Sequence, residues 1–220
     1  MSIEVVIGHG LADDPVRVQV REWIAEHYRT VHNLPVTLAQ CPTVEWSKGA
    51  AVNSAIEAST ANIIILADAD SWVDPDPLQR AIDHARREGW AMPHSTVNRI
   101  GRQSTADILA GREGRRQMER GGYPALPGGG IVIARKDVWD TVRGVDPRFV
   151  GWGGEDHALG LAMRTLVGPV NARRISPLWH LWHPPAAQCR TPSQASRDLD
   201  ARYRVARDEH ELMTDLVKEW

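Results

Sequence analysis

The chain has 220 residues, a length that suits a single domain with a sizeable core. Its formal net charge of -2 argues against a protein that binds nucleic acid over its general surface, because such surfaces are basic. Two distant cysteines, Cys41 and Cys189, exclude a disulfide framework and a clustered cysteine metal motif. Residues 1–10 carry no basic stretch followed by an apolar one, and no run of about 18 apolar residues occurs. We therefore expect a soluble, unexported protein of the cytoplasm.

Strands and helices are predicted to alternate along the first 88 residues. The predicted strands cover 3–8, 36–40 and 63–66, and the predicted helices begin near residues 16, 47 and 75. Ser47 can cap the second helix, and Pro75 and Pro77 fit the first turn of the third. This alternation predicts a parallel sheet with right-handed crossovers, and so an α/β fold.

The strand at 63–66 leads into two carboxylates, Asp68 and Asp70. Four consecutive apolar residues are typical of a strand that is covered on both faces. Ligands of open α/β sheets bind at the carboxyl ends of such strands. Because alternate residues of an extended segment point the same way, we expect both carboxylates to reach one site that holds a hard divalent cation. The alternative is a cap on a turn or helix.

The pattern loosens after residue 89. Residues 91–100 predict a strand, and 102–122 is polar, with arginines crowded between 112 and 120. We interpret this segment as a solvated helix or a mobile loop, with phosphate contacts as the alternative. A glycine-rich turn at 127–130 precedes a strand predicted over 131–134. Further helices are predicted over 137–142, from about residue 156, and after residue 191.

Two histidines, His180 and His183, precede a pair of prolines. Residues three apart on a strand face opposite ways, but the prolines favour a turn that brings both imidazoles together. Imidazole combined with carboxylate oxygen suits manganese better than calcium. The alternative is a structural role for both rings.

The segment 151–156 reads Gly-Trp-Gly-Gly-Glu-Asp. Glycines let the backbone turn and approach a ligand closely, and Trp152 offers a flat apolar surface on which a sugar ring can rest. Asp156 lies at the predicted start of a helix, where the helix dipole favours its ionised form. An ionised carboxylate beside a ligand can serve as a general base. The alternative is an ordinary helix N-cap.

Together these motifs resemble metal-dependent glycosyltransferases with the GT-A fold, of the beta-1,4-galactosyltransferase (galactosyltransferase C-terminal-domain) type. The matching segments are Pro15-Val16-Arg17, Trp46-Ser47-Lys48 with Asn53, the DXD motif Asp68-Ala69-Asp70, Gly129-Gly130, Gly144, residues 151–156, and His180 with His183. The resemblance covers most of the chain. It implies a mostly parallel central sheet flanked by helices in one catalytic domain over 1–220. That domain would have a nucleotide-sugar half at 1–88, an acceptor half at 89–190 and a C-terminal helix at 191–220.

The resemblance also implies an activity and a set of site residues. The chain would be an inverting hexosyltransferase that moves a sugar from a nucleotide-diphosphate donor, expected to be a UDP-sugar, to an acceptor hydroxyl. Asp156 would be the catalytic base, and Asp70, His183 and His180 would bind Mn²⁺, with Mg²⁺ as the alternative ion. The implied nucleotide-binding residues are Arg17, Lys48, Asn53 and Asp68. The implied acceptor- and sugar-binding residues are Trp152, Gly153, Gly154, Glu155 and Gly130.

The size of the chain and its bare catalytic core resemble those of a bacterial or bacteriophage enzyme. It would act in the bacterial or phage-infected cell, on a glycan, protein, lipid or modified-DNA acceptor. A sugar-phosphate nucleotidyltransferase is one alternative, but it should carry a basic glycine-rich loop where residues 8–14 are acidic. A non-catalytic carbohydrate-binding GT-A-like domain is another, and it predicts loss of an acid or imidazole that this chain retains. A retaining mechanism is disfavoured by the ionisable Asp156.

Overall fold

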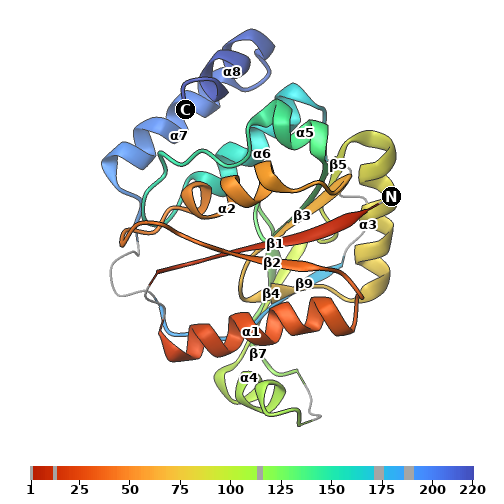
Figure 1. Cartoon of the computed structure of the whole chain (residues 1–220). Helices are drawn as coiled ribbons and strands as arrows, with labels where there is room; N and C mark the ends of the chain where they lie inside the picture. The colour runs from red at the N-terminus through yellow and green to blue at the C-terminus, as the bar shows by residue number, and fades with distance from the viewer. Residues whose placement is uncertain (1, 12–13, 113–115, 171–175, 186–190) are drawn as a thin grey trace.

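The fold is described by a computed structural model that places residues 2–11, 14–112, 116–170, 176–185 and 191–220. Within these residues the chain forms two sheets with helices packed around them (Figure 1). No helix in the described part of the chain is both long enough and apolar enough to cross a membrane.

The larger sheet contains the strand that delivers the two aspartates. Its strands, in spatial order, are β2 (Val36–Gln40), β1 (Ile3–His9), β3 (Ile63–Ala67), β8 (Ile131–Arg135) and β5 (Trp90–Ala91). β1 pairs in parallel with β2 and β3, whereas β8 is antiparallel to both β3 and β5. Four of the five strands therefore run the same way, which confirms a mostly parallel sheet.

The reversed strand β8 corrects the expectation of uniform parallel pairing. The chain enters β8 from Gly130, whose carbonyl accepts a hydrogen bond of 2.9 Å from the backbone N–H of Asp68. The start of β8 thus lies beside the end of β3. This reversal brings the glycine turn at 127–130 to the same edge as the two aspartates.

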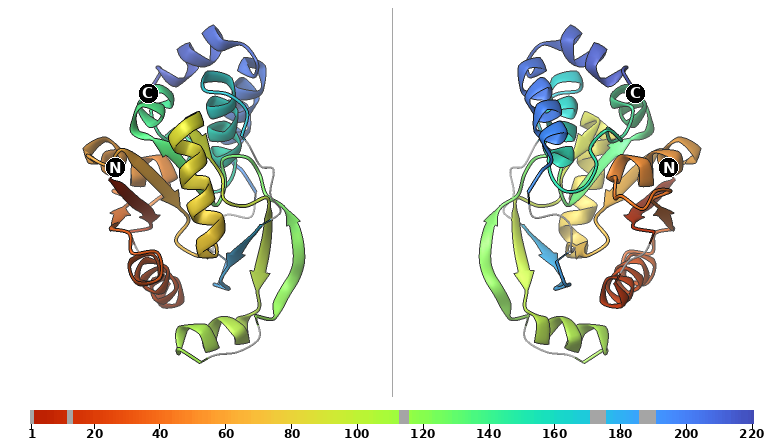
Figure 2. Two further views of the ribbon diagram at one scale, coloured as in Figure 1. Left: turned by 90° about the vertical axis from the view of Figure 1, so that its right-hand side faces the viewer. Right: turned by 90° about the vertical axis from the view of Figure 1, so that its left-hand side faces the viewer.

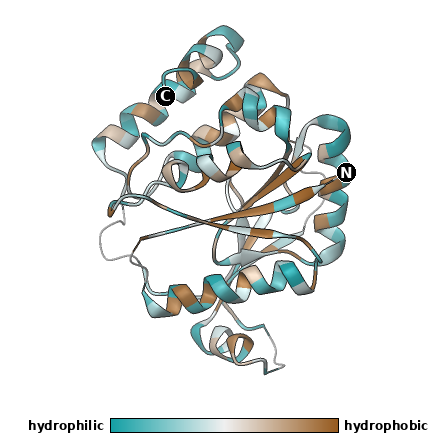
Figure 3. Ribbon diagram, viewed as in Figure 1, coloured by the Kyte–Doolittle hydropathy of each residue, from teal (hydrophilic) through white to brown (hydrophobic). Residues whose placement is uncertain are grey.

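Helices cover both faces of the larger sheet, and further helices lie outside these layers. They are α1 (Pro15–Thr30), α2 (Lys48–Ala58), α3 (Pro75–Glu88), α4 (Arg102–Leu109), α5 (Lys136–Val142), α6 (Glu155–Leu166), α7 (Gln194–Ala206) and α8 (His210–Val217). Side chains of β3 alternate between a core shared with α1 and α3 and a core shared with α2, α5 and α6. The apolar run is therefore buried on both faces, as predicted, and Figure 3 shows hydrophobic residues gathered on the central strands.

The predicted helix starts are confirmed locally. The Ser47 hydroxyl accepts from the backbone N–H of Ala50 at 3.3 Å and caps α2, and Pro75 opens α3. Asp14, which the sequence reasoning did not single out, caps α1 by accepting from Val16 at 2.8 Å. These contacts satisfy backbone donors that the first helical turn leaves free.

The smaller sheet was not predicted. Its spatial order is β4 (Ser71–Trp72), β9 (Pro177–His180), β6 (Thr96–Ile100) and β7 (Met118–Pro124). The strand expected over 91–100 is in fact divided between β5 in the larger sheet and β6 in the smaller one. The hairpin of β6 and β7, with α4 at its tip, extends away from the helical layers (Figure 2).

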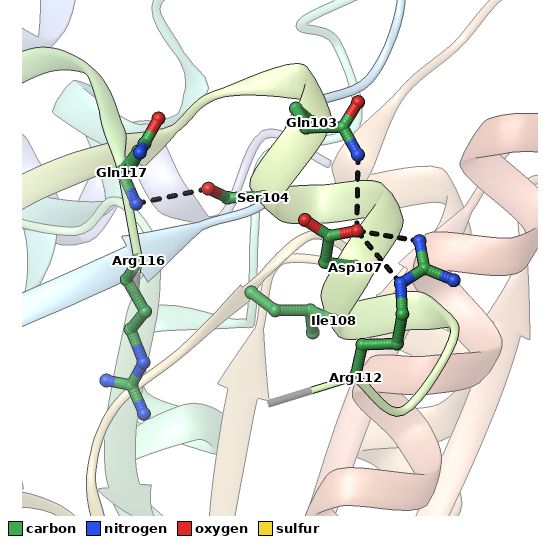
Figure 4. A pocket seen from close by; sticks show the side chains of 7 residues that line it. All are labelled: Gln103, Ser104, Asp107, Ile108, Arg112, Arg116 and Gln117. Carbon is green, nitrogen blue, oxygen red and sulfur yellow. Dashed lines mark hydrogen bonds and ion pairs between the residues drawn. The ribbon is translucent and has the colours of Figure 1, made fainter. Parts of the chain in front are cut away.

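The arginine-rich segment forms part of this arm. A helix, one of the two forms expected for this segment, covers residues 102–109, but the strand β7 was missed. Arg112 pairs with Asp107 at 2.6 Å, and Arg116 lies 3.4 Å from a carboxylate oxygen of Asp74 and over the ring of Trp179. Figure 4 shows Arg112 and Arg116 at a shallow pocket of about 160 Å³. These pairings favour a structural role over phosphate contacts, and residues 113–115 lie outside the described part.

The C-terminal segment forms α7 and α8 in place of the single predicted helix. The chain leaves the helical conformation after Ala206, and Asp208 adopts a left-handed φ of 68° before α8 begins at His210. Both helices pack on α6. The division into nucleotide-sugar and acceptor halves stays a prediction.

Candidate active site

Three side chains with metal-ligating atoms meet beyond the carboxyl end of β3. The Nε2 atoms of His183 and His180 lie 2.9 and 3.5 Å from Oδ2 of Asp70. One ligand atom from each residue lies within 4.8 Å of the others. We call Asp70, His180 and His183 the metal cluster. The structure thus brings together the three residues for which metal binding was predicted.

Strand pairing explains how residues so distant in sequence meet. β4 follows Asp70 directly and pairs antiparallel with β9, which places His180 opposite Ser71. The backbone N–H of Leu181 then donates to the carbonyl of Asp70 at 2.9 Å. β9 ends at His180, and Nε2 of His183 faces the same carboxylate, so the two imidazoles meet as predicted.

The loop after β9 is held from two sides. Thr105 of α4 accepts from the backbone N–H of Trp182 at 2.8 Å, and Arg17 of α1 donates to the carbonyl of Pro184 at 2.9 Å. The same carbonyl lies 3.0 Å from Nδ1 of His183. A proton on Nδ1 would satisfy this carbonyl and leave Nε2 facing Asp70. Arg17, expected to contact a nucleotide, therefore supports the loop that carries His183.

The electrostatics of the metal cluster keep its carboxylate ionised. Burial alone would raise the pKa of Asp70, but His180, His183 and the Ser71 hydroxyl together hold this pKa well below its usual range. Burial lowers the pKa of His180, whereas in His183 the hydrogen bond with Asp70, the charge of Asp70 and the carbonyl of Pro184 together outweigh burial and raise the pKa. One carboxylate and two imidazoles, with Nδ1 of His183 oriented by a carbonyl, are a donor set that fits a divalent transition metal.

Asp68 belongs to a second cluster, built around Lys48. The Nζ atom of Lys48 lies 2.7 Å from Oδ1 of Asp68 and 2.8 Å from Oδ1 of Asp156. Lys48 is 8% exposed and begins α2 directly after its cap. We call Asp68, Lys48 and Asp156 the lysine cluster. It joins the end of β3 to the start of α6.

Two residues of the lysine cluster have raised pKa values, for different reasons. Burial lowers the pKa of Lys48, but Asp156 and Asp68 outweigh it and raise this pKa above its ordinary value. Burial raises the pKa of Asp68 to about 6, with Lys48 opposing and Asp156 contributing. The ammonium therefore stays charged between two carboxylates, and its predicted contact with a nucleotide stays a prediction.

The two aspartates do not share one set of partners, contrary to the expectation from an extended backbone. The backbone turns after β3, and the N–H of Ser71 donates to the carbonyl of Asp68 at 3.3 Å. Alternate residues of a turn do not point the same way, so Asp70 faces the imidazoles and Asp68 faces Lys48.

Asn53 also differs from its predicted role in nucleotide binding. Its side-chain N–H₂ donates to the carbonyl of Val145 at 2.8 Å, and its oxygen accepts from the N–H of the same residue at 2.9 Å. Both ends of the amide are thus engaged by one backbone segment. Asn53 anchors the chain that leads from α5 towards residues 151–156.

The segment 151–156 turns sharply into α6. Gly153 and Gly154 adopt φ values of 96° and 103°, which side-chain-bearing residues rarely adopt. Trp152 is 56% exposed, as a surface for a ligand ring requires. Glu155 and Asp156 occupy the first turn of α6, and neither is its N-cap, which is Gly154. Burial and the charge of Asp156 raise the pKa of Glu155 to about 7.

The glycine turn before β8 lies against Asp156. A Cβ atom on Gly129 would approach Oδ2 of Asp156 to 2.9 Å, and one on Gly130 would approach Nε2 of His94 to the same distance. The absence of side chains thus leaves room at the Asp156 carboxylate. His94 is 2% exposed, and burial lowers its pKa to about 4. Sequence reasoning missed His94, because a lone histidine carries no motif.

A second missed residue is Arg99 of β6, whose Nη1 atom lies 3.4 Å from Nε2 of His180. The signal that would have revealed it is the pairing of β6 with β9, in which Arg99 and His180 are register partners. That pairing joins segments far apart in the chain and has no local sequence pattern.

Comparisons with known proteins agree with this geometry. Residues 11–140 match glycosyl transferase family 2, and residues 116–176 match the N-terminal domain of galactosyltransferase. No curated protein matches the chain.

Two examples among the solved structures that share the fold are a galactosyltransferase and GalNAc-T7. One is the catalytic domain of Drosophila beta1,4galactosyltransferase 7, crystallised with xylobiose, with a TM-score of 0.52 and 10% sequence identity. The matched region covers 95% of this chain and 82% of the galactosyltransferase chain. GalNAc-T7, crystallised with UDP, GalNAc and Mn²⁺, has a TM-score of 0.53 at 12% identity and covers 99% of this chain. This chain spans 54% of the GalNAc-T7 chain.

The architecture is therefore the GT-A fold, as predicted. The family match extends over more than half of the chain, from before α1 to α5, and includes both aspartates after β3. The chain belongs to glycosyl transferase family 2 and is a glycosyltransferase.

Proposed function

We propose that this chain is a metal-dependent inverting glycosyltransferase that transfers a sugar from a UDP-sugar to an acceptor hydroxyl. The observation that carries the proposal is the adjacency of the two clusters. Asp70 of the metal cluster and Asp68 of the lysine cluster follow one strand, and Lys48 links Asp68 to Asp156. The proposed donor site and the proposed carboxylate base would therefore lie at one edge of the larger sheet.

The metal cluster would hold the ion. Asp70, His180 and His183 supply one oxygen and two nitrogens, and the relative GalNAc-T7 was crystallised with Mn²⁺ and UDP. We infer Mn²⁺, with Mg²⁺ as the alternative. When bound, the ion would offset the negative charge that develops on the departing nucleoside diphosphate.

Asp156 would accept the proton of the acceptor hydroxyl. Nζ of Lys48 places a positive charge 2.8 Å from Oδ1 of this carboxylate. The acceptor oxygen then forms a bond to the anomeric carbon as the bond from that carbon to the diphosphate breaks. Attack on the face opposite the departing diphosphate inverts the configuration. Asp156 acts as a general base and forms no bond to the sugar.

Neighbouring residues would orient the two sugars. Trp152 presents an exposed ring beside the first turn of α6, and Glu155 stands next to the base. Gly129 leaves space at the Asp156 carboxylate, and Gly130 allows close approach of His94. Closure of residues 151–154 over the donor would exclude water, with which the acceptor hydroxyl competes.

The alternatives predict other features. A nucleotidyltransferase requires a basic loop after β1, and family 2 membership disfavours it. A non-catalytic binding domain would tolerate loss of a cluster residue, yet all six residues of the two clusters are present and in contact. Both observations support an active transferase of the galactosyltransferase type.

The test is a transfer assay with a panel of nucleotide sugars and with glycan, peptide, lipid and modified-DNA acceptors, with and without Mn²⁺. We expect transfer with a UDP-sugar, inversion at the anomeric carbon, and loss of activity in chelator. Asp156→Asn should abolish transfer while UDP binding survives. Asp215→Asn on the exposed side of α8 is the matched control. An active Asp156→Asn variant would remove this carboxylate from the mechanism.

A further inference from the structure

Arg99 places a positive charge beside the metal cluster. In the pairing of β6 with β9, Arg99 is the register partner of His180, so both side chains lie on the same face of the smaller sheet. Nη1 of Arg99 lies 3.4 Å from Nε2 of His180, the atom that faces Asp70. The guanidinium therefore lies next to His180 at one side of the metal cluster.

The side chain of Arg99 is held in place by an uncharged partner. Its Nε donates to the hydroxyl of Tyr123 on β7 at 3.1 Å, and the guanidinium carbon lies 6.0 Å from the centre of the Tyr123 ring. By contrast, Arg112 and Arg116 of the same arm each pair with a carboxylate. No carboxylate pairs with Arg99 among the described residues, so its charge is available to a ligand.

A guanidinium at this position has opposite effects on two ligands. It repels a divalent cation that binds to the metal cluster alone, because like charges at short range disfavour each other. It attracts the diphosphate oxygens of a nucleotide next to that cation, and its planar fork suits two phosphate oxygens. The hydrogen bond to Tyr123 and the contact with His180 hold the guanidinium beside the metal cluster.

We propose that Arg99 binds the diphosphate of the donor and couples donor binding to metal binding. This inference rests on the proposed function. Arg99 lowers the affinity for the metal ion alone and raises the affinity for the metal ion together with the nucleotide. Each ligand therefore promotes binding of the other. By linkage, the factor by which Mn²⁺ tightens UDP binding equals the factor by which UDP tightens Mn²⁺ binding.

The experiment compares Arg99→Gln and Arg99→Lys with Arg80→Gln, which removes one positive charge from an exposed pair on α3. The affinity for Mn²⁺ without nucleotide is obtained from the concentration of free Mn²⁺, measured by electron paramagnetic resonance. The affinity for UDP is measured by calorimetry with saturating Mn²⁺. For Arg99→Gln we expect Mn²⁺ alone to bind about 3- to 10-fold tighter. We expect UDP to bind about 10- to 100-fold weaker, the range for one charged hydrogen-bonded contact. Arg99→Lys keeps the charge and should restore most of the wild-type Mn²⁺ affinity but only part of the UDP affinity.

Two results separate the inference from the proposed function. If wild-type protein binds neither Mn²⁺ nor UDP, the proposed function fails, and the role of Arg99 fails with it. If the wild type binds both but Arg99→Gln behaves like Arg80→Gln in either measurement, the inference about Arg99 alone is overturned. A tighter Mn²⁺ site combined with weaker UDP binding supports it.

Discussion

Asp70 faces two imidazoles from the smaller sheet, whereas Asp68, two residues earlier, faces an ammonium from α2. The pKa of Asp70 lies well below its usual range, while burial raises the pKa of Asp68 to about 6. The turn in the backbone therefore places two aspartate side chains in different surroundings. The metal cluster has ligands suited to a bound metal ion, whereas the lysine cluster already contains a cation, the ammonium of Lys48.

The largest expected contrast between the clusters is in metal binding. Asp70→Ala should lower transfer by about 1,000-fold or more and abolish Mn²⁺ binding, because the only carboxylate among the three described ligands is lost. Asp68→Asn, the matched change in the lysine cluster, should alter Mn²⁺ affinity by less than about 5-fold. Both affinities can be measured without nucleotide. Equal losses in the two variants would show that the clusters form one site.

The lysine cluster should instead dominate stability. Lys48→Met leaves two carboxylates without their cation and should lower the free energy of unfolding by about 3–5 kcal/mol at pH 7. The loss should shrink at pH 5, where Asp68 becomes protonated. Urea unfolding at both pH values measures this. Lys136→Met removes an exposed pair with Asp140 and should cost less than about 1 kcal/mol. A Lys48→Met variant as stable as that control would contradict the assignment.

The raised pKa of Glu155 gives a smaller, pH-dependent effect. Because this pKa rises from 4.5 in the unfolded chain to about 7 in the folded one, the folded state binds more protons between these values. Stability of the wild type should therefore fall as the pH rises through this window, and Glu155→Gln should not show this fall. The variant should gain about 1–3 kcal/mol over the wild type between pH 5 and pH 8. Unfolding curves without metal test this, with Glu211→Gln on α8 as the control; parallel pH profiles would refute it.

The smallest expected change concerns the support of the metal cluster. Thr105→Val removes the hydroxyl that accepts from the N–H of Trp182 and should weaken Mn²⁺ binding about 10-fold. The stability gained from Lys48 should be unchanged, because Thr105 does not touch the lysine cluster. Thr141→Val on α5 removes a hydroxyl that bonds only within its own helix and serves as the control. Mn²⁺ affinity equal in the two variants would show that α4 does not position His183.

Much of the larger sheet could be predicted from local patterns. Consecutive apolar residues indicated a strand buried on both faces at β3, and the Ser47 and Pro75 signals placed the starts of α2 and α3. These features depend on neighbouring residues alone. In the smaller sheet, β4 has two residues and β9 has four, too few for a periodic pattern, and β7 was missed because its seven residues, MERGGYP, are mostly polar or glycine.

The sequence by itself determined the residue types of the site: two aspartates after a buried strand, a glycine-rich segment ending in Asp156, and two histidines before a turn. Only the tertiary structure decided which of them meet. Lys48 and Asp156 are 108 residues apart, and their contact depends on packing of α2 and α6 against the same face of the sheet. Asp70 meets His180 and His183 because β4 pairs with β9. Local periodicity carries no information on such pairings, since they follow from how buried faces fit together across the whole domain.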